Sequence, residues 1–521
     1  MDAARTAHSS IAGAAEAAAL LAAVDESRRI ATGRLDPDRR SELGQFMTPA
    51  NVARFMAGMF ASHRPVVRVL DAGAGVGSLC AAYVAAMCAR NDPPERIILT
   101  CYEIDPVLFP LLQANLERCR IAGERCGIRV EATPIRADFV KSATATLGAD
   151  LFSSRSDERF DCAILNPPYH KIRSNSTERL LLREAGIETS NLYTAFLALA
   201  AHLLVSGGEM VAITPRSFCN GPYFEPFRRL FLRLMRFRWI HVFESREEAF
   251  SEDGVLQENV VFHAIRTTEK PPNVIISCNR GPDDPDLRVR RVPYDDLVSL
   301  DDRHAFIHIV TDHANDSIRY RIAALKATLA GLGLTVSTGR VVDFRSREHL
   351  RMEPEHGTVP LIYPCHLRDG FVRWPNPKSR KPNAMVRARE TEDLLVPSAH
   401  YVLVKRFSAK EERRRVTAAV YDPARVPTDV VGFENHLNYF HRNGLGMEPE
   451  LAVGLAAFLN STLVDLFFRQ FSGHTQVNAT DLRSLRYPSA EQLRTMGSRI
   501  GASFPSQEDL DALVDEVLFG G

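Results

Sequence analysis

Short, strand-like apolar runs alternate with helix-like stretches from residue 66 to residue 266, and this alternation limits the possible folds more than any other feature of the sequence. The apolar runs cover residues 66–70, 97–102, 128–130, 162–165, 210–213, 240–243 and 259–265. Stretches with helical periodicity lie between them, over residues 78–88, 107–119, 192–204 and 223–235. Strands that alternate with helices are typical of a doubly wound, mostly parallel sheet. The sequence therefore predicts an α/β fold here.

The rest of the chain divides around this α/β region. A chain of 521 residues is long enough for several domains. Turn-rich segments at 270–272 and 281–286 indicate a boundary. We expect an N-terminal helical extension over residues 1–40, the α/β domain over 41–268, a linker over 269–320 and an α+β domain with a helical tail over 321–521.

Composition indicates a cytoplasmic protein. No uncharged apolar run reaches the roughly 18 residues of a membrane-spanning helix. The alanine-rich start contains acidic residues, which is atypical of a signal peptide. The nine cysteines form no CxxC pair, a pattern of a reducing compartment rather than of disulfides or a metal site. We therefore expect neither a membrane segment nor a metal.

The net charge of zero averages unlike regions. Lys and Arg total 64, and Asp and Glu also total 64. Over residues 321–420, however, 19 basic residues face 10 acidic ones. Basic clusters lie at 378–381, 405–406 and 413–415, as in the sequence-independent footprint of duplex nucleic-acid binding. For any single arginine, a solvated surface role remains the alternative.

A glycine-rich turn follows the first strand of the α/β region. The strand at 66–70 runs into Asp71, and Gly73, Gly75 and Gly77 follow before a helix begins. Glycines let the backbone turn tightly and approach a ligand closely. The spacing G-x-G-x-G differs from the dinucleotide fingerprint G-x-G-x-x-G. A plain strand–helix turn is the alternative to a cofactor loop.

Acidic residues end the next two strands. Glu103 is placed to accept hydrogen bonds from ribose hydroxyls, and Ile104 follows it. Asp105 before Pro106 has the pattern of a helix cap. Asp138, followed by Phe139, is a candidate for an adenine amino group.

Upstream, Gly44 to Pro49 precede an amphipathic helix. Thr48 is predicted as the N-cap and Pro49 as the first helical residue. A free helix N-terminus also attracts a carboxylate.

The most specific segment is Asn166-Pro167-Pro168-Tyr169, which ends the strand at 162–165. Two successive prolines fix the backbone and remove two N–H donors, so the turn presents acceptors. The Asn166 side-chain carbonyl and the Pro167 backbone carbonyl match the two N–H groups of a planar amino group. Tyr169 offers an aromatic face to a base taken out of a duplex.

In this order and spacing, these elements resemble S-adenosylmethionine-dependent DNA amino-methyltransferases of the gamma class, with a TaqI-like, Rossmann-like catalytic domain. A closer resemblance is to PstI/BsuBI-type modification methylases. The resemblance implies S-adenosylmethionine as cofactor and the N6 of adenine in double-stranded DNA as target. It also implies base flipping, a C-terminal target-recognition domain, a monomer on DNA and a restriction endonuclease on a separate chain.

The resemblance also implies an aromatic residue that packs against the flipped base. Phe250 matches its position best, with Phe218 and Tyr223 as alternatives. Two other functions remain open from the sequence. In the first, the same methyl-transfer chemistry acts on an RNA base or on a protein glutamine side chain. In the second, the chain is a non-catalytic DNA-binding protein on this scaffold.

Overall fold

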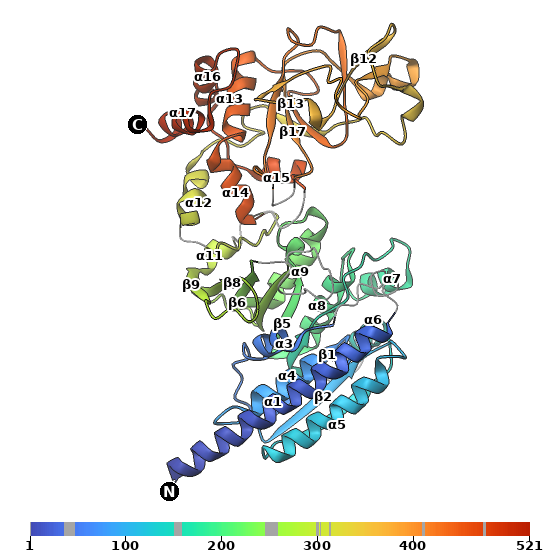
Figure 1. Ribbon diagram of the computed structural model, residues 1–521, viewed down its shortest axis with the longest axis vertical. Helices are drawn as coiled ribbons and strands as arrows, with labels where there is room; N and C mark the ends of the chain where they lie inside the picture. The colour runs from blue at the N-terminus through green and yellow to red at the C-terminus, as the bar shows by residue number, and fades with distance from the viewer. Residues whose placement is uncertain are drawn as a thin grey trace. The chain divides into compact units, whose positions relative to one another are not determined.

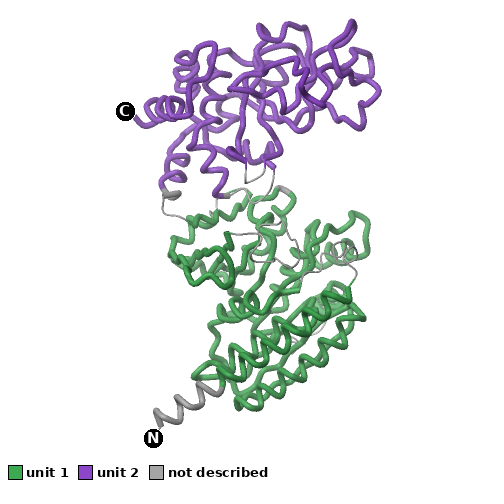
Figure 2. The backbone as a smooth tube through the Cα atoms, in the orientation of Figure 1, with its two compact units in different colours: residues 1–311 green, residues 312–521 purple. Residues whose placement is uncertain are grey.

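The computed structural model describes residues 2–35, 47–150, 159–244, 259–298, 302, 304–311, 314–408, 412–471 and 476–520. The chain forms two compact units, residues 1–311 and residues 312–521 (Figure 2). Each unit has its own hydrophobic core.

A nine-stranded sheet forms the centre of the first unit. Its strand order is β3-β2-β1-β4-β5-β7-β6-β8-β9. Strands β3, β2, β1, β4 and β5 are parallel, and β7 is antiparallel to both β5 and β6. The predicted mostly parallel α/β sheet is confirmed. The bounds are β1 Val66–Ala72, β2 Arg96–Tyr102, β3 Arg129–Ile135, β4 Phe160–Leu165, β5 Leu204–Pro215, β6 Met235–Phe243, β7 Asn259–Arg266, β8 Asn273–Asn279 and β9 Arg288–Pro293.

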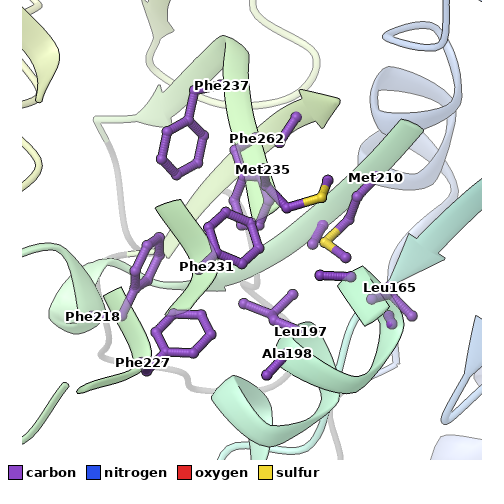
Figure 3. Close-up of a cluster of buried hydrophobic side chains, with 14 of the residues drawn as sticks. Leu165, Leu197, Ala198, Met210, Phe218, Phe227, Phe231, Met235, Phe237 and Phe262 are labelled. Carbon is purple, nitrogen blue, oxygen red and sulfur yellow. The ribbon is translucent and has the colours of Figure 1, made fainter. Parts of the chain in front are cut away.

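Helices cover both faces of this sheet because alternate strand residues point to opposite sides. On β1, Val67 and Val69 pack with helices on one face, and Leu70 packs on the other. Figure 3 shows the cluster on the same face as Leu70, where Leu197 and Phe231 point towards the sheet. The helices on the first face are α1 Asp2–Arg34, α3 Ala50–Ala57, α4 Ser78–Cys88 and α5 Phe109–Arg125, and those on the second include α6 Phe139–Asp150, α8 Leu192–Leu203 and α9 Glu225–Leu234.

The N-terminal helix α1 is part of the first unit. Figure 1 shows α1 running alongside α4 and α5. Leu20 and Val24 are buried against these helices, and Ser27 donates to Asn115 of α5 over 3.2 Å. The expected helical extension therefore packs on the α/β domain.

The expected linker over residues 269–320 is corrected by the structure. Strand β8 pairs in parallel with β6, and β9 pairs antiparallel to β8. The division between the units falls between residues 311 and 312. Turn-rich segments also connect the strands of a sheet, so their prolines could not distinguish a hairpin from a linker.

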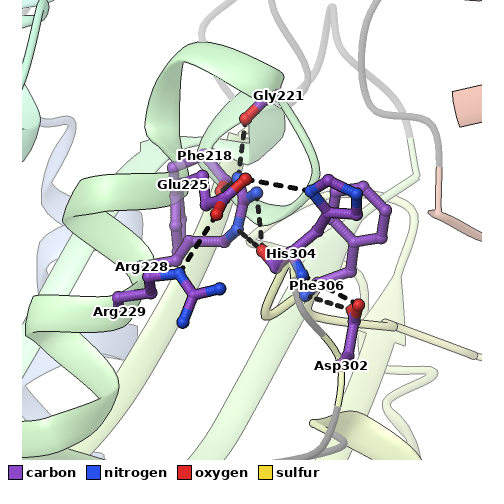
Figure 4. A network of polar contacts seen from close by, with 8 residues as sticks. All are labelled: Phe218, Gly221, Glu225, Arg228, Arg229, Asp302, His304 and Phe306. Atoms are coloured by element: carbon purple, nitrogen blue, oxygen red, sulfur yellow. Dashed lines mark hydrogen bonds and ion pairs between the residues drawn. The ribbon is translucent and has the colours of Figure 1, made fainter. Parts of the chain in front are cut away.

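A buried arginine ties the segment after β9 to the turn between β5 and α9 (Figure 4). Arg228 is 1% exposed and donates to the carbonyls of Phe218 at 3.0 Å, Gly221 at 2.7 Å and His304 at 2.8 Å. The Glu225 carboxylate lies 2.9 Å from His304 Nδ1. Burial lowers the pKa of Arg228 to about 10. One side chain thus satisfies three backbone carbonyls.

The second unit contains two smaller sheets and a group of helices, in agreement with the α+β prediction. One sheet has the order β10-β20-β17-β18-β14-β13 and the other β11-β15-β12-β19-β16. The strands are β10 Thr335–Thr338, β11 Leu350–Arg351, β12 Thr358–Ile362, β13 Leu367–Arg368, β14 Phe371–Val372, β15 Ala384–Val386, β16 Leu395–Pro397, β17 Tyr401–Lys405, β18 Ala418–Tyr421, β19 Val430–Phe433 and β20 Leu437–His441. The helices include α12 Ala314–Ala324, α13 Pro449–Leu459, α14 Thr462–Phe471, α15 Ala479–Ser484, α16 Ala490–Arg499 and α17 Gln507–Phe519.

Across the described ranges, no single helix is long and apolar enough to cross a membrane. The bent pair Pro449–Leu459 and Thr462–Gln470 passes that test only when its two helices are taken together.

Candidate active site

A cavity of about 830 Å³ opens at the carboxyl ends of β1, β2 and β4. The strand order reverses between β1 and β4, and ligands of open α/β sheets bind at such a switch point. Nine residues predicted from the sequence line it: Thr48, Gly73, Gly75, Glu103, Ile104, Asp138, Phe139, Asn166 and Pro168. Asp71, Gly77, Pro167 and Tyr169 are not in its wall. The structure thus brings most of the predicted site together.

The glycine-rich turn adopts backbone angles that side chains disfavour. The φ angle is +75° at Gly73, +59° at Gly75 and +87° at Gly77, all in the region that glycine enters readily. The Tyr102 carbonyl accepts the N–H of Gly73 over 2.9 Å, which ties the turn to the end of β2. Gly77 is the N-cap of α4, so the first residue of that helix, Ser78, borders the cavity.

Asp105 has the predicted capping role, and Glu103 is held in the cavity wall. Asp105 Oδ1 accepts the N–H of Val107 over 2.7 Å and caps the turn before α5. Glu103 is 5% exposed, and its two carboxylate oxygens accept the N–H groups of Gly75 at 2.8 Å and Asp105 at 2.7 Å. Burial raises the pKa of Glu103, and these two N–H donors oppose that rise. Glu103 is therefore a fixed acceptor in the cavity wall.

Asp138 and Phe139 begin α6 beside the same cavity. Asp138 Oδ1 accepts the N–H of Val140 over 2.9 Å, so this carboxylate is a helix cap. The Phe139 ring lies 5.3 Å from the Tyr102 ring and 5.0 Å from the Phe196 ring, between centroids. Ile104 also lines the cavity and is 58% exposed. Apolar and aromatic side chains in one wall suit a flat aromatic ligand.

Asp71 lies beneath the glycine-rich turn. It is fully buried, and Cys80 Sγ lies 3.3 Å from its Oδ2. Within the described part of the chain, Asp71 Oδ1 has no hydrogen-bond partner. Burial raises the pKa of the Asp71 carboxyl to about 7. A buried carboxyl oxygen left unpaired is costly, and the raised pKa favours the neutral, protonated form of this group.

The predicted capping role of Thr48 is wrong. Helix α3 begins at Ala50, Pro49 is its N-cap, and no side chain caps it. Instead, Thr48 is 4% exposed and its Oγ1 accepts a hydrogen bond from Asn166 Nδ2 over 3.0 Å. The residue is therefore connected directly to the strand-end motif 118 positions away.

The Asn166–Tyr169 turn is held at its side chains as well as by its prolines. The Tyr169 hydroxyl donates to Asn166 Oδ1 over 3.0 Å and lies 3.3 Å from the Ile213 carbonyl. Burial raises the pKa of Tyr169. Its ring meets the Tyr193 ring edge-on at 6.1 Å. Because Thr48 and Tyr169 contact opposite ends of the amide, the orientation of the Asn166 side chain is fixed.

The aromatic residue expected against a flipped base is only partly located. Phe250 lies outside the described residues. Phe218, one alternative, is 2% exposed and packs in the core against Phe227 and Phe262, which excludes it as a base contact. Tyr223, the other alternative, is 78% exposed.

Sequence reasoning gave helix α8 and the segment after Tyr169 little or no part in the cavity. Leu192 and Phe196 from α8 line it, as do His170, Lys171 and Arg173. The four-residue spacing of Leu192 and Phe196 places them on one helix face. That spacing does not say which face borders a ligand, because α8 is apolar on most sides.

Comparison with known proteins assigns this chain to a family. The Eco57I restriction-modification methylase model matches residues 124–250. The chain is 44% identical to the Type II methyltransferase M.PstI of Providencia stuartii, over 95% of this chain and 96% of that protein. It is 43% identical to M.BsuBI of Bacillus subtilis, over 96% and 98%. The chain belongs to the Type II methyltransferases.

The fold of this Type II methyltransferase is shared by a solved structure. The Type IIL restriction-modification enzyme MmeI, solved in complex with DNA, aligns with a TM-score of 0.54 at 12% identity. The alignment covers 90% of this chain and 72% of MmeI. The predicted resemblance to PstI/BsuBI-type methylases is confirmed.

The cofactor of this methyltransferase is S-adenosylmethionine, and the cavity fits it. Glu103 is an acceptor suited to ribose hydroxyls, and Phe139 and Ile104 suit adenine. The buried Ser78 hydroxyl, which has no partner among the described residues, lines the cavity at the turn end. This polar atom suits the charged amino-acid end of the cofactor.

Two arginines of the basic cluster at 413–415 are buried or paired in the second unit, and polar side chains of β20 are buried as well. Arg415 is 1% exposed, and Arg414 donates to Gln507. Asn438 is fully buried and donates to the Val477 carbonyl over 2.8 Å, and Tyr439 is 1% exposed. These residues stabilise the fold, so charge clusters in sequence overstate the charged surface.

Proposed function

We propose that this protein transfers the methyl group of S-adenosylmethionine to the N6 of adenine in duplex DNA, as the modification enzyme of a restriction–modification system. The observation that carries the proposal is the fixed Asn166 amide in the cavity wall, beside the cofactor-binding residues. Its carbonyl and that of Pro167 would accept the two N–H groups of a planar amine.

The chain's own residues would act by positioning. When both substrates are bound, the cofactor supplies an activated methyl group, and holding the amine in line with it provides much of the rate. Asn166 Oδ1 would accept one N6–H and the Pro167 carbonyl the other, which directs the nitrogen lone pair towards the methyl group. The new bond from nitrogen to the methyl carbon would replace the sulfur–methyl bond and leave S-adenosylhomocysteine, and the nitrogen would release one proton to solvent water. Asp138, Phe139, Glu103 and the glycine-rich turn hold the cofactor.

A base inside a duplex cannot reach this cavity, so the target adenine must leave the stack. Tyr169 and Phe250 are proposed to pack against it. The enzyme is proposed to be a monomer on DNA in the cytoplasm, with its endonuclease on another chain. The second unit favours DNA over an RNA base or a glutamine side chain as the target. The alignment with MmeI, which was solved in complex with DNA, covers 90% of this chain and therefore includes part of the second unit.

The test is to express the protein, recover the host DNA and map N6-methyladenine by single-molecule sequencing. Mass spectrometry of the nucleosides distinguishes N6-methyladenine from N4-methylcytosine. A methylated sequence motif supports the proposal. Unmethylated host DNA from protein that binds S-adenosylmethionine would overturn it.

A further inference from the structure

Two loops of the second unit meet at one carboxylate. Residues 343–349 form the first loop and residues 374–381 the second, and we call them together the two-loop surface. The Tyr363 hydroxyl donates to Asp343 Oδ1 over 2.7 Å, and Lys381 Nζ donates to Asp343 Oδ2 over 2.9 Å. Asp343 therefore joins the two loops to each other and to Tyr363, the residue after β12.

Buried polar groups hold the second loop rigid. Asn383 is 1% exposed, and its Oδ1 accepts the N–H of Asn376 over 2.8 Å and lies 2.9 Å from His366 Nε2. Asn376 Nδ2 donates to the Cys365 carbonyl over 3.2 Å, and Ser379 Oγ lies 3.3 Å from Cys365 Sγ. A loop fixed in this way loses little conformational entropy when it binds a partner.

The two-loop surface carries positive charge that the protein leaves unneutralised. Asp343 is paired with Lys381, and Glu348 is the other acidic residue of the two loops, so five basic side chains against two acidic ones leave an excess of three positive charges. Arg345, Arg347, Lys378 and Arg380 are all exposed, and none of the four pairs with an acidic side chain of the described residues. Each lies within four positions of Asp343 or Lys381, so all four lie near the point where the loops meet. Such a cluster of free cations complements a polyanion.

An exposed aromatic ring lies among these cations. Phe344 is 75% exposed, and the Arg345 guanidinium carbon is 5.5 Å from its ring centroid. Its neighbour Asp343 is held by the hydrogen bonds that it accepts from Tyr363 and Lys381. Duplex DNA offers both matching features, since phosphates bind cations and thymine methyl groups or base steps accept an apolar side chain.

We propose that the two-loop surface is the face of the second unit that binds duplex DNA, with the four cations on phosphates and Phe344 on the bases. This inference rests on the proposed function. Its second loop contains the basic cluster at 378–381, whereas Arg345, Arg347 and Phe344 of the first loop belong to none of the charge clusters in the sequence.

The first test removes the charges and measures the salt dependence of binding. The variant Arg345→Ala/Arg347→Ala/Lys378→Ala/Arg380→Ala is titrated with a short duplex carrying the site mapped in the wild-type methylome, and with a scrambled duplex. Each phosphate contact contributes roughly 0.9 to the slope of log affinity against log salt. We expect the slope to fall by about 3 to 4, with both duplexes weakened alike.

The control removes two exposed cations elsewhere in the unit. Lys326 and Arg486 flank the bridge between Ala327 and Tyr487, and both are exposed. The variant Lys326→Ala/Arg486→Ala should keep the wild-type slope. Thermal unfolding and S-adenosylmethionine binding should match wild type in both variants, which shows that any loss is not a folding defect.

The second test isolates the aromatic residue. Phe344→Ala should leave the salt slope unchanged and lower the preference for the mapped site over the scrambled duplex by about tenfold, the range of one lost base contact. Phe344→Leu should retain most of that preference.

The outcomes separate this inference from the proposed function. If wild type methylates its site and the charge and Phe344 variants bind as wild type does, the two-loop surface is wrong and the function stands. If wild type binds neither duplex and methylates no DNA, the proposed function itself fails. Tighter binding of an RNA duplex than of DNA would overturn the choice of partner.

Discussion

Replacement of Thr48 by valine tests how the catalytic amide is oriented. The two side chains have nearly the same shape, so Thr48→Val removes the acceptor of the Asn166 Nδ2 hydrogen bond at 3.0 Å and leaves the packing in place. Thr48 is 4% exposed, whereas Asn166 borders an open cavity that water can enter. The amide would then lose the contact that holds its nitrogen end.

The structure sets the size of the effect. An unsatisfied buried donor costs about 1–3 kcal/mol, and partial access of water places this one in the lower half of that range. A change of about 1.4 kcal/mol in the barrier is a tenfold change in rate. We therefore expect methyl transfer about 5- to 30-fold slower, with folding stability close to wild type.

The assay is single-turnover transfer of labelled methyl at saturating cofactor and duplex, together with calorimetric titration of S-adenosylmethionine. Thr48→Ser keeps the hydroxyl and should restore most of the rate. A normal transfer rate in Thr48→Val would refute the positioning role. A normal rate with weaker cofactor binding would show instead that Thr48 serves the cofactor alone.

Four further changes test the site and the fold. Asn166→Ala should lower methyl transfer at least about 100-fold while the dissociation constant for S-adenosylmethionine is unchanged, and retained transfer would exclude Asn166 as the catalytic amide. Glu103→Gln would set an amide N–H against a backbone N–H, so cofactor binding measured by calorimetry should weaken about tenfold; equal binding would contradict its role. The pKa of Asp71 is about 7 in the folded protein against 3.8 ordinarily, so the folded state keeps this proton to a higher pH than the unfolded state does. Stability should fall as pH rises from about 4 to about 7 and level off above, and Asp71→Asn should flatten this part of the melting-temperature profile. Arg228→Met orphans three carbonyls and should cost about 3 kcal/mol or more in urea unfolding, whereas the exposed neighbour change Arg229→Met, which breaks a surface ion pair with Glu225 at 3.1 Å, should cost about 0.5 kcal/mol.

The chemistry of the site could be predicted from the sequence because its parts follow strands. Glu103 and Asn166 come directly after an apolar run, and Gly73 comes three positions after one. Carboxyl ends of parallel strands meet at one edge of a sheet, so these residues had to converge once the sheet was recognised as parallel.

Other predictions failed because local patterns are ambiguous. Thr48-Pro49 reads as a helix cap in sequence, yet the hydroxyl bonds Asn166 and Pro49 is the cap. The prolines at 271–272 and 285 read as a linker, yet they lie beside β8 and β9 of the sheet. A capping residue and a turn have the same sequence signature whether or not a distant element pairs with them.

By itself the sequence determined the α/β fold and which residue types stand at the strand ends, because strand periodicity and turn chemistry are local. Only the tertiary structure decided which of those residues touch. It joined Thr48 to Asn166 across 118 positions, buried Arg415 and left Arg345 and Lys378 in solvent. Burial and pairing depend on which faces of distant elements pack together, and no stretch of local sequence contains that information.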